Sequence, residues 1–226
     1  MSTTNTEAKL ANLGPVAQLT AGRLPERLAR LVIGLWLYGL SIALMIEGAV
    51  GAAPWDVFHA GVALHAPLSL GTIIVLTALG VLAAWIPLRQ MPGLGTVLNT
   101  ALLGPFADLS LALLPEPDGI VMRYGYALSG VVVCAFATAL YVGAQLGPGP
   151  RDGLMTGLAR RTGWPIRRVR TAIEVSVLAS GFLLGGTVGL GTVVFALGVG
   201  PLTQFFLRYL VVHVADPNSS LPRSDS

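Results

Sequence analysis

Two aspartates occupy the same place in two copies of one short pattern, Gly-x-x-Pro-x-Asp. The copies are Gly51-Ala-Ala-Pro54-Trp55-Asp56 and Gly147-Pro-Gly-Pro150-Arg151-Asp152. A carboxylate inside an apolar region is costly, and it marks a site for a solute, a coupling ion or a proton. Proline and an acid in one turn also suit the start of a helix, because the proline lacks an N–H that would have no partner there. Both aspartates are therefore candidate binding residues, and the helix-start interpretation stays open beside that one.

Other polar residues within apolar segments extend the candidate site. Glu47 has no basic residue near it in the sequence and is a candidate proton-carrying or cavity-lining group. Asn99 is a candidate cavity-lining residue, although hydrogen bonding to a neighbouring helix also explains an amide there. Glu174 follows Arg170 by four residues, a spacing that predicts an ion pair on one helix face. The complete candidate set for substrate or ion binding is Asp56, Asp152, Glu47, Arg151, Asn99, Pro54, Pro150, Gly51 and Gly147.

The common catalytic patterns are absent from the sequence. There is no His-Glu-x-x-His, no Gly-x-Ser-x-Gly and no Gly-x-Gly-Asp, so we expect no enzyme, no catalytic residue and no bound metal or cofactor. His59 and His65 have no third metal ligand beside them, and we expect both in an outer loop. The net charge of +3 comes from arginines in a few loops, so we expect no nucleic-acid partner.

The elements that must position these residues are membrane helices. Hydrophobic residues make up 54% of the chain and charged residues 11%, with a mean hydropathy of +0.73, so we expect an integral membrane protein in contact with a lipid bilayer. The predicted fold class is all-α with six transmembrane helices, since about 20 apolar residues cross a bilayer. The expected spans are 28–50, 68–88, 94–114, 123–146, 166–187 and 190–213.

An internal repeat organises these helices. Residues 34–108 align without a gap on residues 130–204, at a constant offset of 96. The repeat includes Gly93-Leu-Gly-Thr96, which recurs as Gly189-Leu-Gly-Thr192. With three spans in each copy, the second copy must be inverted relative to the first, an architecture typical of transporters. The sequence thus predicts a 3+3 inverted-topology repeat.

The segments 54–66 and 150–162 lie between the first and second span of each copy. Each is only about 20 Å long as a helix, short of the roughly 30 Å hydrocarbon core. Non-helical backbone before them survives at membrane depth only against protein or a water-filled cavity. Neither has the charged face of an interfacial helix, so the sequence favours two short re-entrant helices around a central cavity, with an interfacial position as the alternative.

Arginines set the expected orientation, because short cytoplasmic loops collect them. Basic residues precede the first span and gather within 151–170, whereas Arg123 lies beside Glu116 and Asp118. We expect both termini in the cytoplasm and the protein in a bacterial cytoplasmic membrane. The expected regions are a cytoplasmic tail 1–27 with its first 22 residues disordered, a membrane repeat 28–114, an extracytoplasmic linker 115–122, a membrane repeat 123–213 and a cytoplasmic tail 214–226.

The chain resembles the YczE group of the wider YczE/YyaS/YitT bacterial membrane proteins over residues 28–210. The resemblance rests on the two Gly-x-x-Pro-x-Asp copies, on Arg170-x-x-x-Glu174 and on Gly185-Gly-Thr-Val-Gly-x-Gly-Thr192. It implies a transporter-like membrane protein. A frequent neighbourhood with regulators of the aminotransferase-like type further implies, by analogy, a small metabolite or a cofactor-related solute.

Two functions from different classes fit these features. The first is a transporter or facilitator of a small solute, in which the two Gly-x-x-Pro-x-Asp loops form the site and Asp56, Asp152 and Glu47 handle charge. The second is a non-transporting partner or regulator of a membrane or biosynthetic complex, docking through the basic segment 160–170, although such a segment also simply sets topology. A homo-oligomer is compatible with both.

Overall fold

The computed structural model describes residues 14–212 and residue 214, and the described chain is all-α. Residues 1–13 of the expected tail 1–27, and all of the expected tail 214–226 except residue 214, lie outside the described residues. The described helices are α1 (Pro15–Thr20), α2 (Leu24–Gly48), α3 (Pro54–Ala63), α4 (Leu70–Leu88), α5 (Leu94–Leu113), α6 (Gly119–Gly143), α7 (Pro150–Thr162), α8 (Ile166–Leu183) and α9 (Leu190–Leu210).

Five of these helices are long and apolar enough to cross a membrane, namely α2, α4, α5, α6 and α9. The sequence predicts a sixth span over 166–187, where the structure has α8. That helix is 18 residues long, but its first nine residues include Arg167, Arg168, Arg170 and Glu174. Those charges leave too short an apolar run to meet the length and composition of a span.

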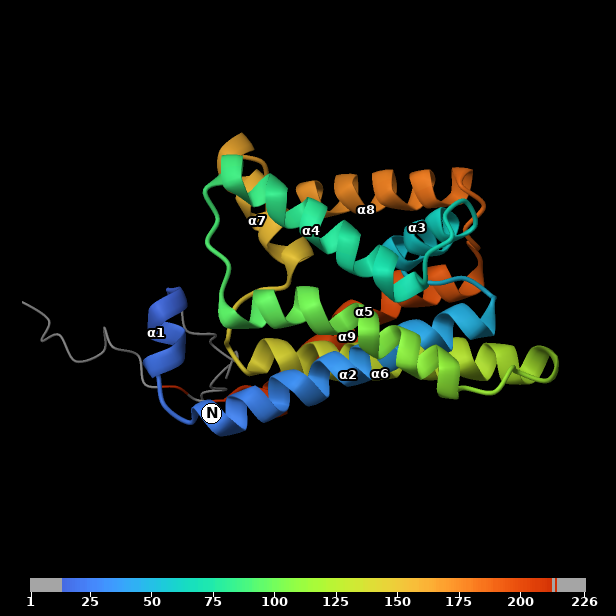
Figure 1. The fold of residues 1–226 in the computed structure, drawn as a ribbon, viewed down its shortest axis with the longest axis horizontal. Coiled ribbons are helices and arrows are strands. Elements are labelled where there is room, and N and C mark those ends of the chain that lie inside the picture. The colour runs from blue at the N-terminus through green and yellow to red at the C-terminus, as the bar shows by residue number, and fades with distance from the viewer. Residues whose placement is uncertain (1–13, 213, 215–226) are drawn as a thin grey trace, which may run out of the picture.

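Equivalent helices of the two copies begin at corresponding residues. The starts of α3 and α7, of α4 and α8, and of α5 and α9 each differ by the offset of 96. The helices lie in two layers (Figure 1): α2, α5, α6 and α9 form one, and α3, α4, α7 and α8 form the other. Between copies, α2 packs on α6, α3 on α8 and α4 on α7. The two copies are therefore interleaved, and the space between the layers is bounded by both.

Close packing of α2 on α6 depends on residues without side chains. A Cβ added to Gly34 would lie 2.9 Å from the backbone nitrogen of Tyr141, and one added to Gly130 would lie 2.6 Å from Cγ of Met45. Small residues of this kind let membrane helices approach each other closely. The α2·α6 pair is consequently a closely packed contact between the two copies.

A buried arginine ties the N-terminal segment to this layer. Arg27 is fully buried and donates from Nε to the Ala144 carbonyl at 2.8 Å and from Nη1 to the Gln18 carbonyl at 2.6 Å. Its Nη2 donates to the Gln145 carbonyl at 2.7 Å. A cation at a helix C-terminus also complements the helix dipole. Residues 15–20, which we expect to be disordered, form α1 and are held against the end of α6.

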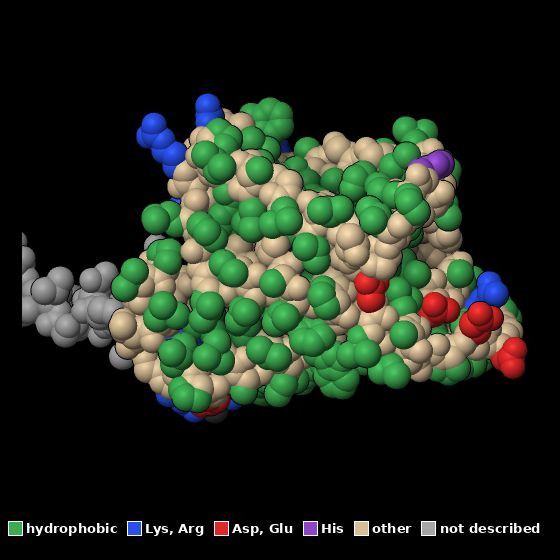
Figure 2. Space-filling model, viewed as in Figure 1, with side chains coloured by type: hydrophobic (Ala, Val, Ile, Leu, Met, Phe, Trp, Pro, Cys, Tyr) green, Lys and Arg blue, Asp and Glu red, His purple; other side chains and the backbone are tan. Residues whose placement is uncertain are grey.

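Charged side chains are unevenly distributed over the surface. Hydrophobic side chains spread across the face shown in Figure 2, and charged ones gather toward its two ends. Exposed large hydrophobics occur on every long helix, including Trp36, Leu79, Leu113, Val132 and Leu197. An apolar girdle with charges beyond it is what a protein embedded in a bilayer presents to lipid.

Candidate functional site

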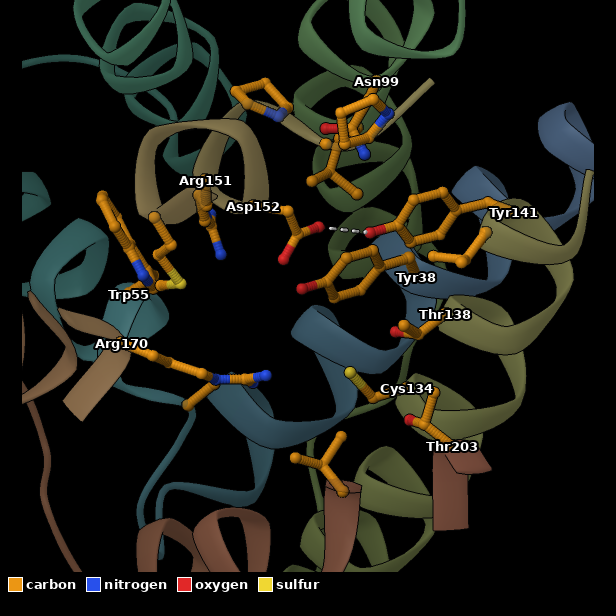
Figure 3. A pocket seen from close by; sticks show the side chains of 18 of the residues that line it. Tyr38, Trp55, Asn99, Cys134, Thr138, Tyr141, Arg151, Asp152, Arg170 and Thr203 are labelled. Atoms are coloured by element: carbon orange, nitrogen blue, oxygen red, sulfur yellow. Dashed lines mark hydrogen bonds between the residues drawn. The ribbon is translucent and has the colours of Figure 1, made fainter. Parts of the chain in front are cut away.

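A cavity of about 570 Å³ lies between the two layers and is lined by residues from α2 to α9. Among the predicted site residues, it is lined by Asp152, Arg151, Asn99, Pro54, Pro150 and Gly147. Figure 3 shows labelled side chains from several helices surrounding this space. The structure thus brings one complete Gly-x-x-Pro-x-Asp copy, and the proline of the other, to a single cavity.

The two Gly-x-x-Pro-x-Asp loops are held by the Gly-Leu-Gly-Thr elements of the opposite copies. The Gly95 N–H donates to the Leu146 carbonyl at 2.6 Å, and the Gly191 N–H donates to the Val50 carbonyl at 2.9 Å. Gly51 and Gly147 have φ of +111° and +117°, a region that L side chains rarely adopt. The repeated glycines therefore serve one structural purpose: each lets a broken backbone segment dock on the start of a distant helix.

The loop before α7 is fixed further by side chains. Thr96 donates from Oγ1 to the Pro148 carbonyl at 2.6 Å, and Trp85 donates from Nε1 to the Pro150 carbonyl at 2.9 Å. Gly153 lies directly against the Trp85 ring, where an added Cβ would overlap ring atoms. These contacts position the first turn of α7, and with it Arg151 and Asp152, on the cavity wall.

Asp152 is exposed to the cavity and accepts a hydrogen bond on Oδ2 from the Tyr141 hydroxyl at 3.1 Å. The Tyr141 ring stacks on Tyr38, with centroids 6.2 Å apart and an angle of 11° between the planes. Both tyrosines line the cavity, and their hydroxyls lie on the Asp152 side of it (Figure 3). Sequence reasoning missed both tyrosines, because a tyrosine in an apolar run carries no signal that distinguishes cavity from lipid.

Arg151 lies over the ring of Trp55, with its Cζ 4.8 Å from the ring centroid. These two residues occupy the same position in the two copies, so one of the positions at which the repeat differs in charge is a direct contact between its halves. A guanidinium over an indole face is a favourable cation–π arrangement. Within the described residues Arg151 has no ion pair and no hydrogen bond, which leaves its N–H groups directed at the cavity.

The predicted ion pair between Arg170 and Glu174 is confirmed, with Nε 2.8 Å from Oε1. Both residues line the cavity from α8, and Figure 3 shows Arg170 reaching into it. The residues at the equivalent positions of α4, Ile74 and Ala78, are apolar and also line the cavity. Two of the four charged residues that shorten the apolar run of α8 therefore line the cavity.

Asp56, unlike Asp152, does not face the cavity. It is 3% exposed and absent from the cavity lining, and its Oδ1 lies 3.7 Å from Nδ1 of His59. Oδ1 of Asp56 and both ring nitrogens of His59 are buried without a hydrogen-bond partner among the described residues. The expectation that His59 lies in an outer loop is wrong: it is fully buried inside α3, because that helix packs between α4 and α8. His65 does lie beyond the end of α3 and is exposed.

Three further candidates have distinct places. Asn99 is 6% exposed and lines the cavity from α5. Glu47 is half-buried near the end of α2 and is not among the lining residues. Gly51 is buried in the loop before α3 and likewise does not line the cavity. Of the two copies of the pattern, the second accordingly contributes more residues to the cavity lining.

Comparison with known proteins places the chain among relatives of similar size. A model of the family described as "Family of unknown function (DUF6198)" matches residues 25–208. The chain belongs to this family. The DUF6198 match includes every cavity-lining residue except Gln18, so the cavity lies within the region that defines the family.

Relatives of this DUF6198 protein include proteins from two bacteria. An "Uncharacterized protein" of Haemophilus influenzae is 38% identical over 180 residues, which cover 80% of this chain and 83% of the relative. "Uncharacterized membrane protein YczE" of Bacillus subtilis is 35% identical over 176 residues, covering 77% and 82%. "Uncharacterized protein YyaS" of the same organism is 24% identical over 193 residues, covering 82% and 94%. The resemblance to the YczE group is confirmed, and no solved structure matches.

Proposed function

We propose that the protein is a transporter or facilitator of a small polar solute across a bacterial cytoplasmic membrane, with the central cavity as its binding site. The observation that carries the proposal is a cavity of about 570 Å³ with four charged lining side chains, bounded in part by the five helices that are long and apolar enough to cross a membrane. Ionisable groups at membrane depth are costly, and they mark substrate and ion pathways. The volume also falls in the range of small-molecule sites, roughly 300–1,000 Å³. The proposal includes no catalytic step.

An inverted 3+3 arrangement, with α8 as the sixth crossing, completes the proposal. Its support is the offset of 96 between equivalent helix starts and the interleaving of α3 with α8 and α7 with α4. Two of the four charges of α8, Arg170 and Glu174, line the cavity, and the other two, Arg167 and Arg168, lie in the first turn, at a helix end of the kind where cytoplasmic arginines collect. Together with the arginine-rich segments, this arrangement favours both termini in the cytoplasm by the positive-inside rule.

The short helices α3 and α7 are the elements that we assign to the solute pathway as re-entrant segments. They contain 10 and 13 residues, or about 15 and 20 Å, which is too short to span. Each begins at a loop docked on the opposite copy, so a movement of one copy against the other would displace both loops. Transporters that use repeats alternate access in this way.

The test is uptake by proteoliposomes from a complex mixture of solutes. Reconstituted protein is incubated with a ¹³C-labelled bacterial metabolite extract, and the captured solutes are identified by mass spectrometry. We expect at least one solute to accumulate above empty liposomes, and Arg151→Gln to reduce its accumulation at least tenfold. Arg160→Gln is the matched control, because Arg160 is exposed on the same helix and does not line the cavity.

The contrary result would be that no solute accumulates with correctly folded wild-type protein. Specific co-purification of a partner protein together with such absence of flux would favour the non-transporting alternative. Equal accumulation by wild-type and Arg151→Gln protein would support transport but would show that this cavity is not the binding site.

A further inference from the structure

Four charged side chains line the cavity, and they are not equivalent. Arg170 and Glu174 neutralise each other in an ion pair at 2.8 Å. Arg151 and Asp152 both face the cavity, and within the described residues neither has an ion-pair partner within 4.0 Å. The cavity wall therefore presents a cation and an anion, adjacent on the first turn of α7, that form no ion pair within 4.0 Å among the described residues.

We propose that the solute is a small zwitterion, with its carboxylate bound by Arg151 and its ammonium bound by Asp152. This inference rests on the proposed function and specifies its substrate class. A zwitterion compensates both wall charges at once, whereas a simple anion would leave Asp152 uncompensated and a simple cation would leave Arg151 uncompensated. An uncompensated charge away from bulk water is strongly unfavourable, so a singly charged solute binds much more weakly than the matching zwitterion.

The geometry of the cation end suits a carboxylate. The Trp55 ring covers one face of the Arg151 guanidinium and leaves the N–H groups at its edge available. A guanidinium binds a carboxylate through two parallel N–H···O hydrogen bonds, a planar match that an ammonium lacks. The stack with Trp55 also restricts the Arg151 side chain, which lowers the entropy lost when the solute binds.

The geometry of the anion end suits an ammonium. Asp152 accepts one hydrogen bond from Tyr141 and retains lone pairs on the cavity side. A primary ammonium has three N–H donors, and the oxygens of Asp152, Tyr141 and the neighbouring Tyr38 lie on the same side of the cavity (Figure 3). The remainder of the wall includes Ile74, Leu103, Phe195 and Val199, which provide an apolar surface for a side chain of moderate size.

The experiment measures the melting temperature of the full-length protein in detergent with matched sets of probes. Each set contains an amino acid, its N-acetyl derivative and its amide, and for amino acids with an uncharged side chain the first derivative is only an anion and the second only a cation. The 20 proteinogenic L-amino acids are used, together with β-alanine and γ-aminobutyrate. A ligand that binds the folded state raises the melting temperature by mass action.

We expect at least one amino acid to raise the melting temperature by several degrees, and its two derivatives to shift it by less than one degree. Asp152→Asn should remove the preference over the N-acetyl derivative, and Arg151→Gln should remove the preference over the amide. Arg160→Gln should retain the wild-type pattern. The melting temperature of each variant without ligand verifies that it is folded.

Three results would overturn the inference. They are equal stabilisation of the wild type by a singly charged derivative, unchanged selectivity in both α7 variants, and no stabilisation by any zwitterion. All three are distinguishable from failure of the proposed function, because uptake of some other solute class from the labelled extract would still establish transport.

Discussion

The helices α3 and α7 begin with the same pattern and face different surroundings. In α7, Asp152 and Arg151 project into the cavity, and the first turn is anchored by Trp85. In α3, Asp56 is buried beside His59, and the equivalent of Trp85 is Gly181, against which the α3 backbone packs directly. A duplicated pattern has thus kept its backbone role in both copies, whereas only one copy supplies the charges of the cavity.

The physical origin of this difference is the partner helix. Gly181 on α8 lets α3 approach so closely that an added Cβ would lie 2.5 Å from the Phe58 nitrogen, and this contact buries the first turn of α3. On the other side, Trp85 keeps α4 and α7 apart by the thickness of its ring, with Gly153 accommodating it. The equivalent contacts of the two copies therefore differ by a bulky residue in one and a glycine in the other.

The largest expected effect on the free energy of unfolding comes from replacing the Trp85–Gly153 contact by its equivalent in the other copy. Gly153→Val, which copies Val57 of α3, places a side chain into the Trp85 ring and should lower the free energy of unfolding by about 3 kcal/mol. Trp85→Gly alone should cost about 3–5 kcal/mol through the space it leaves. The double variant reproduces the α3·α8 pairing, so its cost should be clearly less than the sum. Unfolding in mixed micelles measures all three, and strict additivity would mean that the two residues are not coupled.

The next effect tests whether the two docked loops are equally tight. Gly51→Ala should cost about 3 kcal/mol, because strain from its positive φ adds to a clash with backbone: the new Cβ would lie 2.6 Å from the Gly189 nitrogen. Gly147→Ala, whose nearest atom would be 3.0 Å away, should cost about 2 kcal/mol. Gly80→Ala is the control, because Gly80 has open space around it. Equal costs at all three positions would contradict the docking of the loops.

A smaller effect, in the opposite direction, is expected at the buried histidine. His59→Met copies Met155 of α7 and removes two ring nitrogens that are buried without partners among the described residues. The free energy of unfolding should therefore rise by about 1–2 kcal/mol. The reverse change in α7, Met155→His, should lower it. A loss of stability in His59→Met would show that the histidine is compensated, by Asp56 at 3.7 Å or by buried water.

The smallest effect is expected at the ion pair on α8. The side chains of Arg170 and Glu174 are 56% and 33% exposed, and such a pair at i, i+4 contributes at most about 0.5 kcal/mol. Glu174→Gln should leave the free energy of unfolding nearly unchanged. It frees Arg170 to act as a second cation in the cavity, so binding of N-acetyl amino acids should strengthen. Destabilisation by several kcal/mol would instead assign the pair a structural role.

Much of the backbone arrangement is predictable from the sequence. Pro54 and Pro150 do begin the short helices, because proline suits the first turn in any surroundings. The Arg170–Glu174 pair is likewise a local consequence of helix spacing. Whether the predicted span at 166–187 crosses the membrane is not predictable from the sequence. A hydropathy pattern does not distinguish charges that face a cavity from charges that exclude a helix from the membrane.

The surroundings of the candidate residues are not predictable in the same way. Asp56 and Asp152 have the same local sequence signals, and only tertiary packing against Gly181 or Trp85 separates them. The docking of each Gly-x-x-Pro-x-Asp loop on a Gly-Leu-Gly-Thr element joins residues about 50 or 140 positions apart in the sequence. The repeat does contain one indication of this docking. The Gly-x-x-Pro-x-Asp and Gly-Leu-Gly-Thr patterns both recur in both copies, which is expected of segments that contact each other.

The most direct test of the central claim, that Asp152 and not Asp56 faces an aqueous solute cavity, is the access of a reagent to each aspartate position. Asp152→Cys and Asp56→Cys are prepared with Cys134→Ala, which removes the single native cysteine. Reconstituted protein is then treated with a charged, water-soluble methanethiosulfonate reagent. We predict fast modification at position 152 and almost none at position 56. Equal modification at the two positions, or faster modification at position 56, would contradict the account.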